Sequence, residues 1–245
     1  MLIRLLGPPI AILAVGGTAY ALVPQPSATP LQLPDLVQER PSKLVVTRAG
    51  REYRLGFRSA VRNVGPGPLE IVGARQDRSV DEMTADQVLK HASGRSTVKH
   101  RVGALRYVVS PDHRHWHLLG FQRYTLERRD GTTVVRDGKT GFCLGDRYAF
   151  TEQPSARQYP GRCGLGQPAR LGITQGIAPG YGDAYAANLE GQYLRLNGVP
   201  AGTYRLVHRV NAGRPLRERR YDNNAAAVTL RLRWVRGVPQ IKLVG

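Results

Sequence analysis

Short runs of alternating apolar and polar residues, separated by glycine and proline turn signals, recur along most of this chain. In the clearest run, residues 227–234, apolar side chains occupy every second position from Val228 to Trp234. Because successive side chains point to opposite faces of a strand, this pattern predicts a half-buried antiparallel strand. Similar runs predict strands at 43–48, 53–58, 69–72, 105–110, 115–127, 132–136, 193–196 and 203–211. The chain is therefore expected to form an all-β, antiparallel β-sandwich-like domain.

Two other kinds of segment interrupt the predicted strands. Residues 81–91 have a helical composition, and we expect the one short helix of the fold there. Residues 145–182 are rich in glycine, proline and glutamine and predict a long irregular stretch. Loops of that length are usually functional or mobile.

The N-terminus has the pattern of an export signal. A short basic start is followed by apolar residues 5–17, and Ala19 and Ala21 place small residues where a signal peptidase cleaves. We expect a signal peptide over residues 1–21; the alternative is an uncleaved anchor, because residues 5–23 are nearly long enough to span a bilayer. Both predict a secreted protein or one on the extracytoplasmic cell surface.

The remaining chain divides by composition into a Pro-rich linker (22–33), a folded domain (34–236) and a C-terminal tail (237–245). Only two cysteines are present, Cys143 and Cys163. In an oxidising compartment they are most simply one disulfide.

The 245 residues contain 36 Lys and Arg against 18 Asp and Glu, a net charge of +18. Such a surface attracts anionic partners, so an acidic cell-surface polymer or lipid headgroups are candidate partners. The densest basic patch comprises Arg214, Arg217, Arg219 and Arg220. No helix-turn-helix, zinc-finger or aromatic RNA-binding pattern is present, and we expect no nucleic-acid partner.

Three histidines at alternate positions, His113, His115 and His117, form the densest chemical cluster in the sequence. In an extended segment all three rings point the same way, which predicts a metal site. A regular strand would separate the first and last by about 13 Å, so we expect the segment to curve or bulge around the ion. Imidazole ligands suit Cu(II) or Zn(II); the affinity order favours copper, but spacing alone does not separate them.

Several segments resemble the lysyl oxidase family. The histidine segment followed by Phe121, Tyr124 and Leu126 is similar to its copper-binding segment. Residues 137–146 (DGKTGFCLGD) resemble the segment that carries the lysine precursor of the family's cofactor, and 175–186 (QGIAPGYGDAYA) resemble the tyrosine segment. Residues 33–36, 55–57, 200–204 and 221–224 keep the family's order, so the resemblance covers about residues 33–235.

Some features depart from the animal enzymes. The spacing from the last histidine to Phe121 is one residue shorter, most of their cysteines are missing, and Ala186 follows the tyrosine in place of glycine. These departures indicate a bacterial-type, minimal member and leave its substrate range open.

The resemblance implies a copper-dependent amine oxidase whose lysine tyrosylquinone cofactor derives from Lys139 and Tyr185. Such an enzyme would convert a primary amine, free or in a peptidyl lysine, to an aldehyde with O₂, releasing ammonia and hydrogen peroxide. Lys139 would need a lowered pKa to act as a nucleophile. Asp183 is a candidate catalytic base, although a turn-forming role for this residue fits the sequence equally well.

Two other functions remain open from the sequence. The first is an exported three-histidine copper-binding protein that lacks the quinone. The second is a cell-surface binding module that uses its arginine-rich faces. A Lys139→Arg substitution would separate the first from the enzyme, because it removes the quinone precursor and leaves the histidines.

Overall fold

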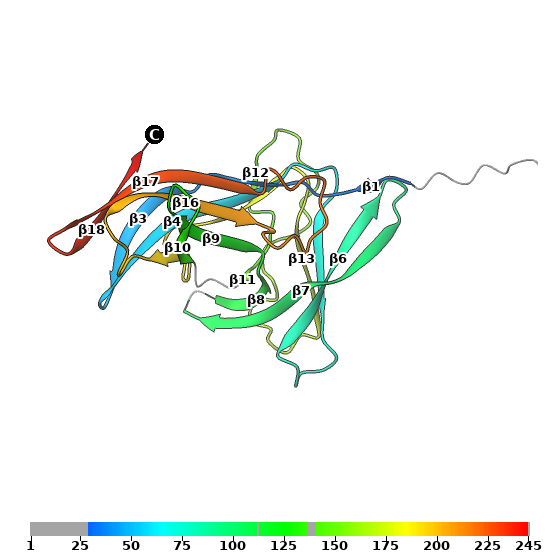
Figure 1. The fold of residues 1–245 in the computed structure, drawn as a ribbon. Coiled ribbons are helices and arrows are strands. Elements are labelled where there is room, and N and C mark those ends of the chain that lie inside the picture. Colours follow the sequence, from blue (N-terminus) through cyan, green and yellow to red (C-terminus); the bar gives the residue numbers. More distant parts are fainter. Residues whose placement is uncertain (1–28, 112, 137–140, 245) are drawn as a thin grey trace, which may run out of the picture.

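The computed structural model describes residues 29–111, 113–136 and 141–244, which form strands β1 to β18 in three antiparallel sheets (Figure 1). The proposed signal peptide or anchor (1–21) and residues 22–28 of the proposed linker lie outside the described residues. Among the residues that are described, no helix has the length and hydropathy needed to cross a membrane.

The first sheet has the strand order β11-β8-β7-β6-β5-β13, with β1 paired to β6. Its strands are β1 (Leu31–Gln32), β5 (Leu69–Ala74), β6 (Glu82–His91), β7 (Ser96–Ser110), β8 (His113–Leu119), β11 (Gly141–Phe142) and β13 (Gly172–Ile177). The three candidate histidines therefore lie on β8, between β7 and β11.

The second sheet has the order β10-β9-β16-β17-β18. Its strands are β9 (Gln122–Glu127), β10 (Thr133–Arg136), β16 (Gly202–Val210), β17 (Ala225–Val235) and β18 (Val238–Val244). Strand β18 pairs with β17 along its length, so the sheet extends into the residues proposed as a C-terminal tail.

The third sheet has the order β12-β14-β4-β15, with β2 and β3 also paired to β4. Its strands are β2 (Leu36–Gln38), β3 (Ser42–Ala49), β4 (Glu52–Asn63), β12 (Tyr148–Ala149), β14 (Tyr181–Tyr185) and β15 (Tyr193–Arg195). Tyr185, the candidate tyrosine precursor of the cofactor, is the last residue of β14.

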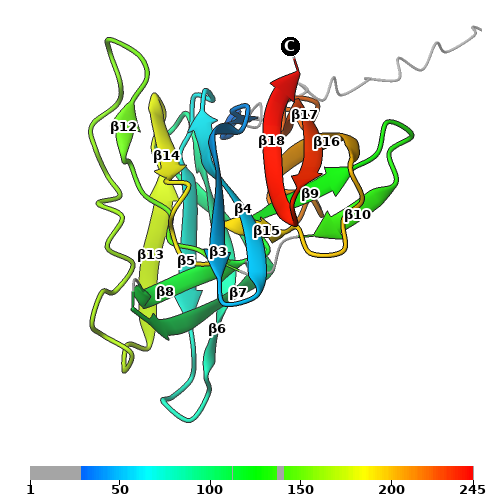
Figure 2. The same cartoon turned by 90° about the vertical axis from the view of Figure 1, so that its left-hand side faces the viewer.

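The hydrophobic core takes buried side chains from all three sheets. The second and third sheets meet where β16 and β17 contact β2 and where β18 lies beside β3, as Figure 2 shows for β18 and β3. The alternation predicted for residues 227–234 is confirmed in part: Leu230 and Leu232 are fully buried, Arg231 and Arg233 are exposed, and Trp234 is half-buried. Burying such apolar faces contributes about 25 cal/mol per Å² of apolar surface and holds the sheets together. The predicted all-β, sandwich-like fold is confirmed.

The short helix predicted for residues 81–91 is wrong, because this segment forms strand β6. Its buried side chains alternate, with Met83, Ala85 and Leu89 inside and Thr84 exposed. Pairing with β5 on one side and β7 on the other satisfies its backbone. These non-local contacts outweigh the helical propensity of the segment.

The stretch 145–182 is less irregular than its composition predicts, since it contains β12 and β13 and begins β14. Asp146, which is buried, organises the remainder. Its carboxylate accepts hydrogen bonds from the backbone N–H groups of Gln158, Tyr159 and Ala178 at 2.7 to 2.9 Å. Carboxylate acceptors of this kind replace sheet pairing for a buried loop backbone.

Candidate metal centre

The side chains of His113, His115 and His117 leave β8 on the same side and converge, as the alternate spacing predicts. One ring nitrogen from each histidine lies within 4.8 Å of those of the other two. The Nε2 atoms of His115 and His117 are only 2.8 Å apart. His113 and His117 are buried and His115 is half-buried, so the cluster is largely shielded from water.

The cluster has the composition and size of a site for one transition-metal ion. Nitrogens bound to one ion at about 2.1 Å lie up to about 4.2 Å apart, so the observed spread needs only small ring adjustments. Neutral imidazoles without thiolates suit Cu(II) or Zn(II). The residues present therefore fit a copper ion held by these three side chains.

Of the two distortions that the spacing allows, a curve or a bulge, the bulge is absent from the pairing of β8 with β7. Strand β8 pairs with β7 in unbroken register, from Ser110 opposite His113 to Leu105 opposite Leu118. The reach of the imidazole side chains, rather than a break in the backbone, brings the nitrogens together.

Two neighbours orient His113 from outside the cluster. Its Nδ1 lies 3.0 Å from Oγ of Ser110 and 3.5 Å from a carboxylate oxygen of Glu190. Partners on one ring nitrogen fix the ring and leave the other nitrogen for a metal. Glu190 comes from the loop after β14, and the sequence offered no signal for it.

Strand β11 lies directly against the histidines. An added Cβ at Gly141 would lie 2.6 Å from the Cβ of His117, so only glycine permits this close approach. Gly141 comes two residues after Lys139, whose own position lies outside the described residues. Gly141 therefore brings the chain next to a candidate ligand.

A Gly141→Ala substitution is expected to weaken copper binding by about 10-fold or more, because the added methyl group must displace His117. Competition with a chelator of known affinity measures the effect. Gly103→Ala, on β7, is the matched control, since its added Cβ would make only ordinary contacts. Equal affinities for both variants and the wild type would contradict the role assigned to this close approach.

Tyr185 lies on the other side of the same segment. Its ring packs edge-on against that of Phe142, with centroids 5.1 Å apart. Its hydroxyl lies 2.9 Å from the carbonyl oxygen of Cys143 and 2.5 Å from a carboxylate oxygen of Asp183. Gly141 touches His117 and the adjacent Phe142 touches Tyr185, so β11 connects the two parts of the candidate site.

Asp183 is completely buried, between Tyr185 and Arg147. The Nε of Arg147 donates to its other carboxylate oxygen at 2.6 Å. Burial raises the pKa of Asp183 to about 6, although the Arg147 charge and the Tyr185 hydroxyl oppose that rise. Burial and the neighbouring Asp183 charge raise the pKa of Tyr185 well above its ordinary value, so the phenol needs a base to lose its proton.

Arg147 is a site residue that the sequence reading missed. Its guanidinium also donates to the carbonyl of Cys143 at 3.1 Å and lies 5.7 Å from the centre of the Tyr185 ring. The only available signal was its place just after the lysine segment, which is weak among so many arginines.

The predicted Cys143–Cys163 disulfide is present, with Cα atoms 5.8 Å apart. It links the residues after β11 to the loop that runs beside the middle of β8. There the carbonyl of Cys163 accepts a hydrogen bond from the backbone N–H of Trp116 at 2.8 Å. The crosslink thus holds both segments that border the histidines.

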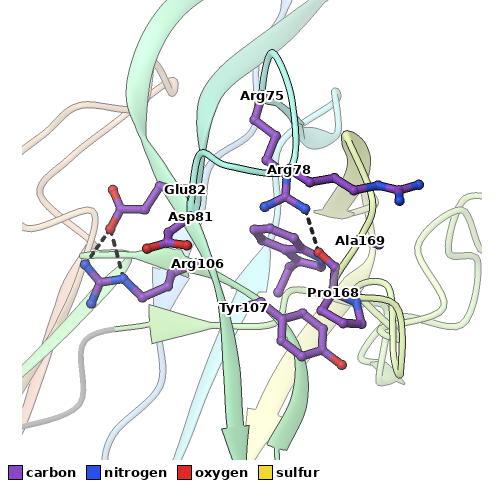
Figure 3. A pocket seen from close by; sticks show the side chains of 9 residues that line it. Arg75, Arg78, Asp81, Glu82, Arg106, Tyr107, Pro168 and Ala169 are labelled. Carbon is purple, nitrogen blue, oxygen red and sulfur yellow. Dashed lines mark hydrogen bonds and ion pairs between the residues drawn. The ribbon is translucent and has the colours of Figure 1, made fainter.

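A hollow of about 750 Å³ opens on the opposite face of β8, lined in part by Trp116 (Figure 3). Trp116 alternates with His115 and His117, so its side chain leaves β8 on the face opposite the histidines. Figure 3 shows Arg75 joined to Pro168 on one wall and Glu82 joined to Arg106 on another. The Arg75 contact holds the loop around residue 168, whereas Glu82 and Arg106 pair between β6 and β7.

Comparison with known proteins agrees with the site. A family model described as lysyl oxidase matches residues 77–237. Lysyl oxidase homolog 2 of Gallus gallus is 31% identical over 135 residues and that of Homo sapiens 30%, and lysyl oxidase homolog 3B of Danio rerio is 29% identical over 136 residues. Each match covers 55% of this chain but only 16% of the relative.

The family match extends over more than half of the chain and includes the histidines of β8, Cys143 and Tyr185. The same region contains the three converging imidazoles and the buried tyrosine that the motifs predict. The chain therefore belongs to the lysyl oxidase family.

Proposed function

We propose that this protein is an exported copper-dependent amine oxidase that converts primary amines to aldehydes with O₂, releasing ammonia and hydrogen peroxide. The observation that carries the proposal is the convergence of three imidazoles on one side of β11, with a buried tyrosine on the other. Membership of the lysyl oxidase family supports the same chemistry. Free amines and peptidyl lysine are both candidate substrates.

His113, His115 and His117 are the proposed copper ligands, through neutral imidazole nitrogens. Lys139 and Tyr185 are the proposed precursors of a lysine tyrosylquinone. Together the ion and the quinone would supply the electron acceptor for the amine and return the electrons to O₂. The contact of Tyr185 with the residues just after Lys139 supports this pairing.

Asp183 is the proposed base. It would take the α-proton of the substrate amine, and its carboxylate accepts the hydrogen bond of the Tyr185 hydroxyl, so it faces the side chain proposed to become the cofactor. Arg147 holds the other carboxylate oxygen and keeps Asp183 pointed at the ring. Because the carboxylate is buried, its raised pKa makes it a stronger base than an exposed aspartate.

Two features support a location outside the cytoplasm for the proposed enzyme. The proposed signal peptide or anchor and the Cys143–Cys163 disulfide both suit a secreted or cell-surface protein. The proposed partners are an amine or peptidyl-lysine substrate and O₂, with an anionic cell-surface component as a further candidate and no nucleic acid.

Peptide mass mapping of copper-loaded protein tests the proposal. After exposure to air, the peptides containing Lys139 and Tyr185 are expected as one crosslinked species with an added oxygen and fewer hydrogens. Lys139→Arg is expected to bind copper normally and to lose the crosslink, the redox-cycling stain and amine oxidation. Separate peptides in a fully active wild type would contradict the cofactor, whereas copper binding without crosslink or activity would indicate a copper protein that lacks the quinone.

The amine oxidation rate of the copper-loaded protein is expected to rise with pH through about 6 and then level, because Asp183 becomes a base only when ionised. Its neighbours that bear on this titration are Arg147, Tyr185 and the backbone N–H of Gly145. A pH–rate profile measures the effect. Asp183→Asn is expected to lose most activity and this acid limb, whereas an unchanged profile in that variant would assign the limb to another group.

A further inference from the structure

The outer face of the second sheet is strongly basic. Arg205 of β16, Arg231 and Arg233 of β17, and Lys242 of β18 are all exposed there. The strand neighbours of Arg205 and Arg231 are buried, and Arg233 follows buried Leu232, so these cations point away from the core. The strand register keeps them on one face, since Arg231 stands opposite Lys242.

Among the described residues these four cations lack close acidic partners, although Arg205 interacts electrostatically with Glu127. In the part of the chain that the structure describes, none of them forms an ion pair. Glu127 is the acidic residue opposite Arg205 in the register, but its carboxylate binds Arg209 at 2.8 Å. The arginine patch noted in the sequence differs, because Arg220 there pairs with Asp35 and Arg214 lies over the ring of Tyr221.

Two hollows adjoin this face. One of about 460 Å³ is lined by Arg128, Arg129, Asp130 and Thr203 among others, so it has two cations and one carboxylate. The other, of about 230 Å³, is lined by Arg231, Arg233 and Lys242 among others. Thr203 stands directly opposite Arg231 in the β16–β17 register, so the hollows are neighbours. Together they mark a band across the sheet, the basic strip, comprising Arg129, Arg205, Arg231, Arg233 and Lys242.

The strip runs across the strands rather than along one of them. Neighbouring strands lie about 4.8 Å apart, so from the end of β9 to β18 it spans roughly 14 Å and offers a cation about every strand. In a linear polymer with one carboxylate on each sugar, successive charges are separated by a distance comparable to this strand spacing. Five unpaired or weakly paired cations beside two hollows are complementary to such a chain.

We propose that the basic strip binds a linear acidic polysaccharide and so retains the exported protein at an acidic cell surface or matrix. This role is separate from amine oxidation, because the strip belongs to the second sheet and the histidines to the first. A bilayer is the weaker fit, because the exposed apolar side chains of this hairpin are divided between the turn, at Val235 and Val238, and the far end of β18, at Leu243 and Val244. Hollows also suit a chain better than a flat surface.

Binding of the full-length protein to polygalacturonate tests the proposal, with neutral dextran and vesicles containing anionic phospholipid as comparison probes. The strip variant combines Arg231→Gln, Arg233→Gln and Lys242→Gln. A matched control with the same charge loss combines Arg78→Gln, Arg95→Gln and Arg157→Gln, which are exposed and outside the strip. Unfolding temperatures of both variants check that the fold is retained.

We expect the wild type to bind polygalacturonate and not dextran. The strip variant should bind about 10-fold more weakly and show a smaller salt dependence, since it loses three ionic contacts to the polymer. The control variant should stay within about twofold of the wild type. Equal losses in both variants, binding only to the vesicles, or no binding to the polymer would each overturn the proposal.

Discussion

The His117→Ala variant is expected to bind copper at least about 100-fold more weakly than the wild type, because changes to groups that merely orient a ligand already cost 10- to 100-fold. His117 is the most constrained of the three ligands: it is buried, its Nε2 lies 2.8 Å from that of His115, and Gly141 packs on its Cβ. Chelator competition and metal content per protein measure the loss.

His100→Ala is the matched control for this prediction. His100 lies on the neighbouring strand β7 and is largely exposed, with its ring 2.8 Å from the carboxylate of Asp86. Its removal is expected to leave copper content unchanged. Full copper content in the His117 variant, or equal losses in both, would contradict the three-histidine site.

The Tyr185→Phe variant is expected to bind copper normally while losing quinone staining and amine oxidation to background. Phenylalanine keeps the packing against Phe142 but removes the oxygen on which the proposed cofactor depends. The change also leaves one oxygen of the buried Asp183 without its hydroxyl donor, which should cost about 1–3 kcal/mol of unfolding free energy. Stain intensity, oxygen uptake and denaturant unfolding measure the three effects.

Tyr159→Phe separates loss of the cofactor from general destabilisation. The Tyr159 hydroxyl is 2.8 Å from the carboxylate of Glu70, and the side chain is buried to the same extent as Tyr185. Its removal should lower stability by a similar amount and leave staining and activity intact. Amine oxidation by the Tyr185→Phe variant would exclude Tyr185 as the cofactor precursor.

The strands were predictable where one face of a segment meets the core. Residues 227–234 alternate cleanly because β17 buries one side and exposes the other. Residues 81–91 were misread because alternation there is carried by Met83, Ala85, Gln87 and Leu89, a set with little strand propensity. Only pairing with β5 and β7, and the hydrogen bonds of Gln87 to the backbone of Arg217, fix this segment as a strand.

The candidate site divides in the same way. Residues close together in the chain, such as the three histidines, are brought together by strand geometry alone. Arg147 and Asp183 are 36 positions apart, and Glu190 is farther still from His113. No local pattern relates such residues, because their contact depends on which strands pair.

The sequence by itself determined that the chain makes antiparallel strands and that three imidazoles leave one of them on the same side, since both follow from the two-residue period of a strand. The tertiary structure alone decided that β11 lies between His117 and Tyr185, and that Arg147 reaches Asp183. Those contacts arise from pairing β11 with β8 and β14 with β4, and a single short motif cannot encode such non-local pairing.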